Sequence, residues 1–491
     1  MGTTERRAHH QVTFAVLTAG VIAFALLQSL VTPVLPTIEA ALHTNQSDVT
    51  WVLTGYLLSA SIFTPILGRL GDMIGKKHMF VLALAALSAG CLLAALATSL
   101  ATMIVARVIQ GVGGGVLPLA FGIIRDEFPP DRVAGAVGAI SALIAVGAGV
   151  GLVVAGPIVD LLSYHWLFWA PLVVLVAAAI AAQLLVPESP VRTPGSINWP
   201  AALLLSGWLV ALLLSVSQAP SWGWGSPEVL GLLAAAAVLA ALWVLVESRS
   251  AQPLIDMGMM RLRAVWATNL GALLFGVSMY AAFAFLPQFL QTPSAAGYGF
   301  GASITESGLL LLPQTAASFV LGLVSGRLAQ RVGSKKVLVI GAFVAALGDL
   351  AFVLAHDSRT AVTLGSIVMG AGFGLAFAAM SNLIVAAVPP AQTGVASGMN
   401  ANIRTIGGAV GAAVMASVVT AGTAPGRLPP ESGYSHGFLV LTGALACSAL
   451  AALLIPSIPR DPRTHAEPDV ELRHPEAALI AGATVVGDES E

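Results

Sequence analysis

Four ionisable side chains lie in or beside the long apolar stretches of this sequence, and they are the residues best placed for chemistry. Arg107, Asp349 and Arg404 stand inside such stretches, and Glu306 stands at the edge of another. A charge at the centre of a membrane helix costs roughly 2.5–3.5 kcal/mol on insertion scales, so residues of this kind mark paths for ions or substrates. Asp349 is the only acid deep inside a stretch, which makes it a candidate proton carrier. A hydrogen-bonded structural acid is the alternative reading of this residue.

No enzymatic or metal-binding pattern accompanies these residues. The sequence has no HExxH motif and no paired carboxylates inside its apolar stretches. Cys91 and Cys447 are far apart, which fits neither a disulfide framework nor metal-ligand spacing. We expect no enzyme activity, no cofactor and no metal.

The elements that carry the ionisable residues must be membrane helices. Of 491 residues, 57% are hydrophobic and 9% are charged, and the mean hydropathy is +0.88. That composition is too apolar for a soluble protein of this length. The net charge of −2 offers no basic excess for nucleic acid. The sequence therefore predicts an all-α polytopic protein whose partner is the lipid bilayer, without a nucleic-acid partner.

About twenty apolar residues cross a bilayer, and runs of that size predict about fourteen transmembrane helices. Two six-helix bundles are expected, with two extra helices between them. The predicted divisions are a cytoplasmic N-terminus at 1–12, an N-terminal bundle at 13–187, a linker with the two extra helices at 188–263, a C-terminal bundle at 264–456 and a disordered cytoplasmic tail at 457–491.

Lysine and arginine cluster in alternate loops, and this asymmetry predicts the orientation. All lysines lie in two short segments that end at Lys77 and Lys336, whereas the intervening loops hold only Arg359 and Arg427. Loops rich in Lys and Arg are cytoplasmic. Both termini are therefore expected in the cytoplasm of a multi-pass protein of the cell inner (plasma) membrane.

The two halves repeat each other at a shift of about 258 to 260 residues. Gly68 pairs with Gly326, Lys77 with Lys335, and the two prolines that start at Pro129 with those that start at Pro389. Duplicated bundles of this kind are typical of transporters with a substrate cavity at the bilayer midplane and alternating access.

The segment Gly68 to Lys77 reads GRLGDMIGKK and falls in a predicted cytoplasmic loop. Its glycines permit a tight reversal, and Asp72 can approach a base or a helix N-terminus. We predict a conformational latch made by Gly68, Asp72, Gly75, Lys76 and Lys77. The segment resembles the loop signature between the second and third helices of the major facilitator superfamily. The second copy of the segment has Gln330 where the acid would stand.

Two further segments resemble motifs of the same superfamily. Arg107 to Gly115 resembles its fourth-helix motif, and this resemblance implies that the arginine takes part in proton coupling. We predict Arg107, Gln110, Asp349 and Glu306 as the residues of that coupling. A structural arginine bonded to carbonyl groups is the alternative for Arg107. Gly147 to Pro157 resembles the antiporter motif, although Leu152 replaces its proline. Small residues let helices approach closely, and the predicted packing positions are Gly111, Gly115, Gly147, Gly151, Gly156, Pro157, Gly407 and Gly411.

The helix count and the linker make the chain resemble the fourteen-helix drug:proton antiporter subfamily. That resemblance implies an acid in the first helix, but the sequence has Gln28 there, which cannot titrate. The residues predicted to line the cavity are Gln28, Asn269, Tyr280, Gln288, Asn382, Asn400 and Arg404.

These features predict a proton-coupled exporter of a small amphipathic drug or antibiotic-like compound that works by alternating access. Arg107 and Arg404 favour a neutral or anionic substrate, because charges interact strongly where water is scarce. Uptake of a small metabolite by a proton symporter stays open, since the antiporter motif is incomplete. We expect a monomer.

Overall fold

Residues 3–44, 46–49, 51–189, 198–251, 253–421, 423 and 428–456 are described by the computed structural model. An apolar chain in hydrocarbon must satisfy its backbone hydrogen bonds internally, which favours unbroken helices. Within these residues there is no strand, and fourteen helical segments are long and apolar enough to cross a membrane. The predicted fold class and the predicted helix count are confirmed.

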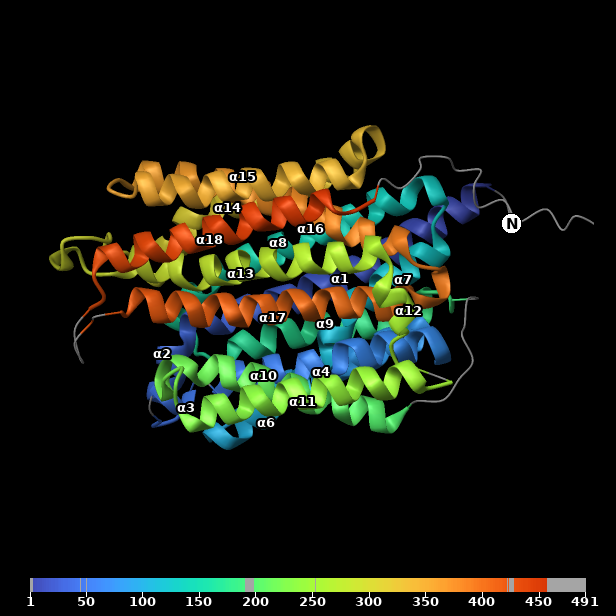
Figure 1. Ribbon diagram of the computed structural model, residues 1–491, viewed down its shortest axis with the longest axis horizontal. Helices are drawn as coiled ribbons and strands as arrows, with labels where there is room; N and C mark the ends of the chain where they lie inside the picture. The colour runs from blue at the N-terminus through green and yellow to red at the C-terminus, as the bar shows by residue number, and fades with distance from the viewer. Residues whose placement is uncertain are drawn as a thin grey trace, which may run out of the picture. The chain divides into compact units, whose positions relative to one another are not determined.

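The first half contains nine helices in the described residues (Figure 1). They are α1 (Thr3–Val31), α2 (Leu35–Ala41), α3 (Gln46–Val49), α4 (Trp51–Ile74), α5 (Lys76–Ala95), α6 (Leu100–Gly111), α7 (Val116–Glu127), α8 (Pro130–Leu161) and α9 (Trp166–Leu185). A short 3₁₀ segment, Val112–Gly115, joins α6 to α7, so that these two helices form one span. Three consecutive glycines lie in that segment and weaken the α-helical preference there.

The described residues of the rest of the chain form the other nine helices. They are α10 (Trp199–Trp222), α11 (Pro227–Arg249), α12 (Met257–Arg261), α13 (Arg263–Gln291), α14 (Ile304–Val332), α15 (Ser334–Leu354), α16 (Arg359–Ala387), α17 (Thr393–Val419) and α18 (Glu431–Leu453). We call α1 and α4–α9 the first bundle and α13–α18 the second bundle. Each bundle has its own cluster of buried apolar side chains.

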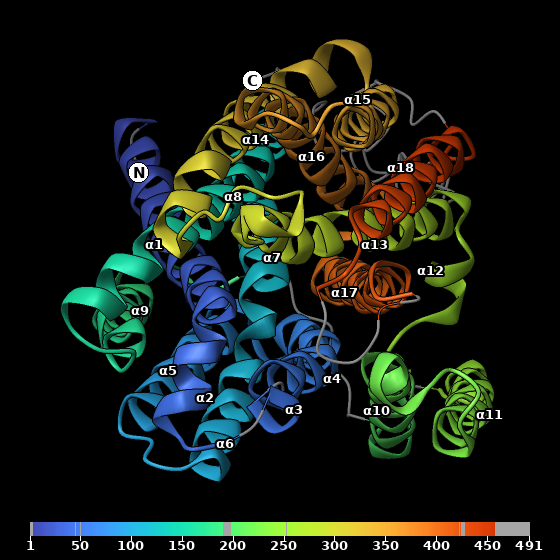
Figure 2. The ribbon, with the colours of Figure 1, turned by 90° about the vertical axis from the view of Figure 1, so that its left-hand side faces the viewer.

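The two bundles meet along two seams. At one seam α4 packs against α17, and at the other α8 packs against α14. Figure 2 shows both pairs from the end of the helices. We call the end that carries all four lysines (Lys76, Lys77, Lys335, Lys336) the basic end.

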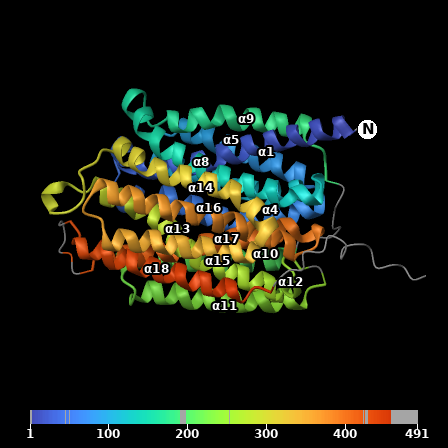
Figure 3. The ribbon, with the colours of Figure 1, turned by 90° about the horizontal axis from the view of Figure 1, so that it is seen from above.

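The two extra helices lie beside one seam only. α10 packs on both α4 and α17, and α11 packs on α10. A third apolar cluster joins α10 to residues of α16 and α17. In Figure 3, α11 lies at the edge opposite α9. The helices α10 and α11 therefore cover the α4–α17 seam and do not cover the α8–α14 seam.

The division of the chain at 13–187, 188–263 and 264–456 stays a prediction. The described helices belong to one compact unit that ends at Ile455. The predicted tail at 457–491, Arg427 and most of the segment that follows α9 lie outside the described residues.

Candidate functional site

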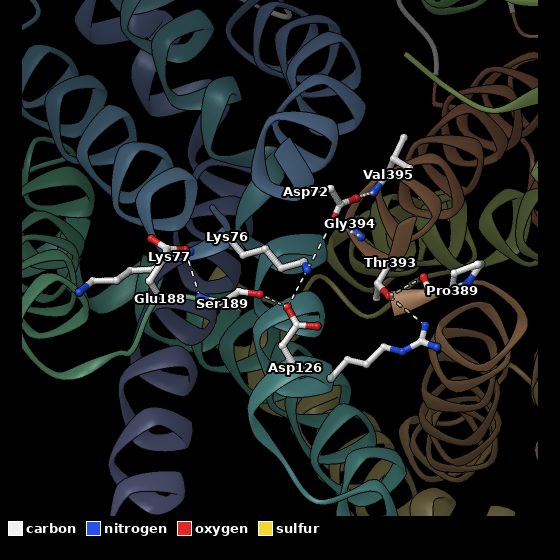
Figure 4. A network of polar contacts seen from close by, with 11 residues as sticks. Asp72, Lys76, Lys77, Asp126, Glu188, Ser189, Pro389, Thr393, Gly394 and Val395 are labelled. Carbon is white, nitrogen blue, oxygen red and sulfur yellow. Dashed lines mark hydrogen bonds and ion pairs between the residues drawn. The ribbon is translucent and has the colours of Figure 1, made fainter. Parts of the chain in front are cut away.

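Asp72 connects the two bundles at the basic end (Figure 4). It stands in the last turn of α4, fully shielded from solvent. Its carboxylate accepts a hydrogen bond from the backbone N–H of Gly394 at 3.3 Å and another from that of Val395 at 3.1 Å. Both N–H groups belong to the first turn of α17 and lack partners within their own helix. A negative charge at a helix N-terminus is stabilising.

Lys76 holds the other side of this carboxylate. The Lys76 ammonium lies 3.5 Å from Asp72 Oδ1 and 2.6 Å from Asp126 Oδ2, and all three side chains are buried. Ser189 donates a hydrogen bond to the same oxygen of Asp126. A buried charge is tolerated where it is paired and hydrogen-bonded. The cation thus joins the ends of α4 and α7 within the first bundle.

Arg125 makes a second connection between the bundles. From the last turn of α7, its guanidinium donates to the carbonyl oxygen of Val385 and, at 2.9 Å, to Thr393 Oγ1. Thr393 is the first residue of α17. Asp72 and Arg125 therefore reach the same helix end from two helices of the first bundle, and the basic end is closed between them.

The other predicted latch residues shape this network. Gly68 lies so close to α17 that a Cβ there would be 2.5 Å from the carbonyl oxygen of Gly394. Gly75 has φ of +138°, a conformation that other residues rarely adopt. Lys77 joins only through its backbone N–H, which donates to Glu188 at 3.3 Å, and its side chain points away from Asp72 (Figure 4).

Arg107 is buried inside the first bundle, on α6. Its Nε donates to the carbonyl of Val52 at 3.1 Å and its NH1 to Gln110 Oε1 at 2.7 Å. The guanidinium carbon lies 4.5 Å from the centre of the Tyr56 ring, and Gln28 donates to the hydroxyl of Tyr56. Arg107 has no acidic partner in the part of the chain that the structure describes. Both of its predicted roles, structural and functional, fit these contacts.

Arg404 occupies a comparable place in the second bundle, on α17. It is 5% exposed, and its guanidinium carbon lies 4.3 Å from the centre of the Phe377 ring. Tyr280 of α13 lies next to it. As with Arg107, no acid pairs with Arg404 among the described residues. Each bundle therefore places one buried arginine over an aromatic ring.

A small cavity between the bundles reaches Arg404. Its volume is about 10 Å³, room for about one water. Leu117 and Phe121 of α7 form one wall, and the other comes from the second bundle through Ser381, Ile384, Ser397, Asn400, Ala401 and Arg404. None of the described residues that line it is acidic. The helices are closed around a polar centre that is too small for a drug-sized compound.

Two buried polar atoms that line this cavity, Ser397 Oγ and Arg404 Nε, have no hydrogen-bond partner within the described residues. Asn382 Nδ2 and both polar side-chain atoms of Asn402 also lack partners there, although neither residue lines the cavity. Asn400 and Asn269 bond to each other at 2.9 Å. Unsatisfied buried polar groups are uncommon in folded proteins. A cluster of them beside a cavity is expected where a substrate or water completes their bonding.

The predicted acids do not lie with the arginines. Asp349 of α15 is fully buried, and its Oδ2 accepts a hydrogen bond from Ser278 of α13 at 2.8 Å. Its other oxygen has no partner in the described part of the chain. Glu306 forms an ion pair with Arg359, in which both side chains are half exposed. Gln288 is exposed on α13, so the structure does not place it at the small cavity.

The glycines predicted to pack helices lie at close contacts. A Cβ on Gly147 would meet Ala25 and the carbonyl of Ile22 on α1, and one on Gly151 would meet Ser29 of the same helix. Gly407 and Gly411 face backbone carbonyls of α13, and Gly111 and Gly115 face α4. Gly156 touches Thr305 of α14, and Pro157 stands inside α8.

Comparison with known proteins identifies the family. The model of the Major Facilitator Superfamily matches residues 17–299 and 269–485. The chain belongs to the major facilitator superfamily. It is a multi-pass membrane transporter and not an enzyme. The segment Gly433–Gly437 matches GxSxG, the pattern around the nucleophilic serine of many hydrolases. Here the segment lies inside α18 rather than at the strand-to-helix turn that exposes such a nucleophile.

Its relatives include named exporters and resistance proteins. It is 30% identical over 403 residues to the "Tetracenomycin C resistance and export protein" of Streptomyces glaucescens, covering 81% of this chain and 74% of that protein. It is 28% identical to the "Multidrug resistance protein B homolog" of Mycobacterium tuberculosis, with 76% and 70% covered.

Two solved structures share the fold. The human organic anion transporter MFSD10 aligns with a TM-score of 0.66 and 16% identity, over 90% of this chain and 99% of the other. The proton:xylose symporter XylE aligns with a TM-score of 0.64 and 14% identity, over 93% and 98%. At such identities the likeness supports the major facilitator fold alone.

Three residues of the site went unnoticed in the sequence. Arg125 and Asp126 stand at the end of the fourth span, where a charged pair resembles any helix end near water. Tyr56 sits among apolar residues, and its position four residues after Val52 on α4 gives no hint of Arg107. An unpaired Arg107 that needs an aromatic or carbonyl partner is the signal that could have directed attention to α4.

Proposed function

We propose that this transporter exports a small amphipathic compound, neutral or anionic, in exchange for protons, and that the basic end faces the cytoplasm of the plasma membrane. We infer the charge of the substrate from the polar centre between the bundles, where the described lining residues include Arg404 and no acid. Relatives named for drug resistance and export support the direction. The protein acts as a monomer with both termini in the cytoplasm.

The centre suits an acceptor-rich compound. Arg404 Nε and Ser397 Oγ belong to residues that line the cavity and are donors without partners in the described residues. A carboxylate, phenolate or carbonyl group would satisfy the donors, and Phe377 and Phe121 would contact an apolar body. A cationic compound would meet unfavourable charge there, because Coulomb interactions are strong at low dielectric.

For the transporter to open toward the cytoplasm, the two bundles must separate at the basic end. The hydrogen bonds from α17 to Asp72 and from Arg125 to Thr393 hold the first turn of α17 against the first bundle. When they break, α17 can move away from α4 and admit substrate from the cytoplasm. The closed arrangement is then one of two alternating states.

For the proton, we propose Asp349 as the carrier, with Arg107, Gln110 and Glu306 as coupled groups. Asp349 has one oxygen engaged by Ser278 and one without a partner in the described chain. Intramembrane acids commonly serve proton transfer in transporters. Because Asp349 lies outside the small cavity, its proton would act by changing the hydrogen bond that joins α15 to α13 rather than by touching substrate.

Transport into inverted membrane vesicles tests the function. Vesicles energised by respiration should accumulate neutral and anionic amphipathic compounds, and an uncoupler should abolish the accumulation. Vesicles that contain the Asp349→Asn variant serve as the coupling control. Accumulation only in right-side-out vesicles would identify the rival, a proton symporter for uptake, and accumulation that survives the uncoupler would remove proton coupling.

A further inference from the structure

A second hollow lies at the basic end, where α1, α8 and α14 meet. We call it the α8–α14 groove, and its volume is about 470 Å³. Its lining includes Phe14, Phe128, Arg132, Gly135, Arg327 and Gln330. These residues stand at the ends of predicted spans, the level at which lipid headgroups meet water.

The groove has a net positive lining. Arg132 lies in the first turn of α8 and Arg327 near the end of α14, and both are exposed. Neither forms an ion pair with any residue that the structure describes. Asp131 is the one acid among the described residues of the lining, so within them it offsets only one of the two arginines.

The two seams differ in one group at this end. The repeat pairs Asp72 with Gln330, and each faces the start of a helix in the opposite bundle. Asp72 accepts hydrogen bonds from the first turn of α17, whereas Gln330 donates one to the carbonyl of Asp131, at 3.1 Å. No side chain caps the start of α8. Among the described residues, the second bundle therefore supplies no anion to the start of α8, and the acid in that first turn is Asp131 of α8 itself.

The rest of the described lining combines the polar side chains of His10 and Gln11 with four apolar residues, Phe14, Phe128, Gly135 and Ala136. The Phe14 and Phe128 rings lie edge to face, with their centres 6.3 Å apart. Gly135 faces open space, since a Cβ there would meet nothing within 4 Å. The groove thus joins a cationic rim to an apolar floor, which matches a molecule with an anionic head and a hydrocarbon body.

We propose that the α8–α14 groove binds one anionic phospholipid of the cytoplasmic leaflet. Its phosphate lies between Arg132 and Arg327, and the first part of an acyl chain follows Phe14, Phe128 and Gly135. Basic pockets between helices on the cytoplasmic side are suited to such headgroups. The lipid supplies from outside the charge that Gln330 cannot, and it links the two bundles at the α8–α14 seam. The inference depends on the orientation and not on export.

Native mass spectrometry of the purified full chain with added phosphatidylglycerol or phosphatidylcholine tests this. The wild type should bind phosphatidylglycerol about tenfold more tightly, because each arginine near an anionic headgroup adds a favourable term. In the double variant Arg132→Gln/Arg327→Gln the preference should vanish. The control Arg261→Gln removes a charge from an exposed residue outside the groove and should keep the preference.

A second pair of variants tests the shape. Gly135→Leu should fill the groove and weaken phosphatidylglycerol binding, while Gly231→Leu on α11 should not, since both glycines face open space. Thermal unfolding of each variant verifies folding. Equal binding of the two lipids by the wild type overturns the proposal, as does a preference that survives both the double variant and Gly135→Leu. If the lipids bind equally while these variants slow transport, the groove admits substrate instead, and the lipid site is wrong.

Discussion

The carboxylate of Asp72 and the backbone N–H of Val395 are 323 residues apart in the chain and 3.1 Å apart in space. An acid of the first half thereby caps the N-terminus of a helix in the second half. Asp72→Asn keeps the size of this buried side chain and removes its charge, and a charge at a helix N-terminus is worth up to ~2 kcal/mol. We expect normal membrane insertion and transport reduced about tenfold or more.

The matched control for this variant is Gln330→Ala, at the corresponding position of the second half. It removes one hydrogen bond to a carbonyl and no charge, so transport should stay near the wild-type rate. Transport assays on equal amounts of inserted protein compare the two. Wild-type activity in Asp72→Asn would refute the latch.

The contact between Gly68 and Gly394 allows a second test. Gly68→Ala puts a Cβ 2.5 Å from the carbonyl oxygen of Gly394, which forces α4 and α17 apart at the basic end. Overpacking of this kind costs about 1–3 kcal/mol, so the population should shift toward a state open at that end. Labelling of Ser397→Cys by an impermeant thiol reagent should speed up about tenfold. Gly231→Ala on α11, where a Cβ meets nothing, should leave the labelling rate unchanged, and equal rates in the two variants would contradict the closure.

The surroundings of Gln28 lead to a third prediction, on substrate charge. Gln28 donates to the hydroxyl of Tyr56, and the Tyr56 ring lies under Arg107. Gln28→Asp would place an acid beside that arginine and lower the positive potential. Cells with the wild type should resist neutral or acidic antibiotics, and cells with Gln28→Asp should gain resistance to quaternary ammonium dyes. A wild type that protects only against those dyes, with no effect of Gln28→Asp, would show the charge inference to be wrong.

Asp349 and Ser278 allow a test of proton coupling. Asp349→Asn can still bond Ser278 but cannot release a proton. Uptake driven by a pH gradient in proteoliposomes should fall to background, whereas exchange of labelled for unlabelled substrate, which needs no net proton movement, should continue. Ser278→Ala, which keeps the acid, should retain gradient-driven transport. Loss of exchange together with driven uptake would indicate a structural acid.

Transmembrane helices could be read from the sequence because apolar length alone decides whether a segment spans a bilayer. Contacts between helices that are far apart in the sequence could not be read from it. Asp72 was expected to meet a base or a helix N-terminus, and it meets both, but nothing in the sequence selects α17 as that helix. Asp349 was visible as a buried acid, whereas Ser278 is one of many serines, and only its hydrogen bond to Asp349 in the folded protein distinguishes it. The repeat helped for positions that occur in both halves, and it failed for Asp126, which aligns with an alanine in the second half.

The position of α10 has a mechanical consequence. It touches both α4 and α17, yet the polar bonds of the linker favour one partner: Trp224 Nε1 donates to Ser417 of α17 at 2.8 Å, and Gln392 donates to Asp256 at 3.3 Å. Among the described residues these two hydrogen bonds join the linker to the second bundle, whereas α10 meets α4 through apolar side chains. If the two bundles rock against each other, α10 and α11 should move together with the second bundle. The face of α4 that touches α10 would then slide along α10. Small side chains on that face would permit the movement, whereas strong contacts would oppose it.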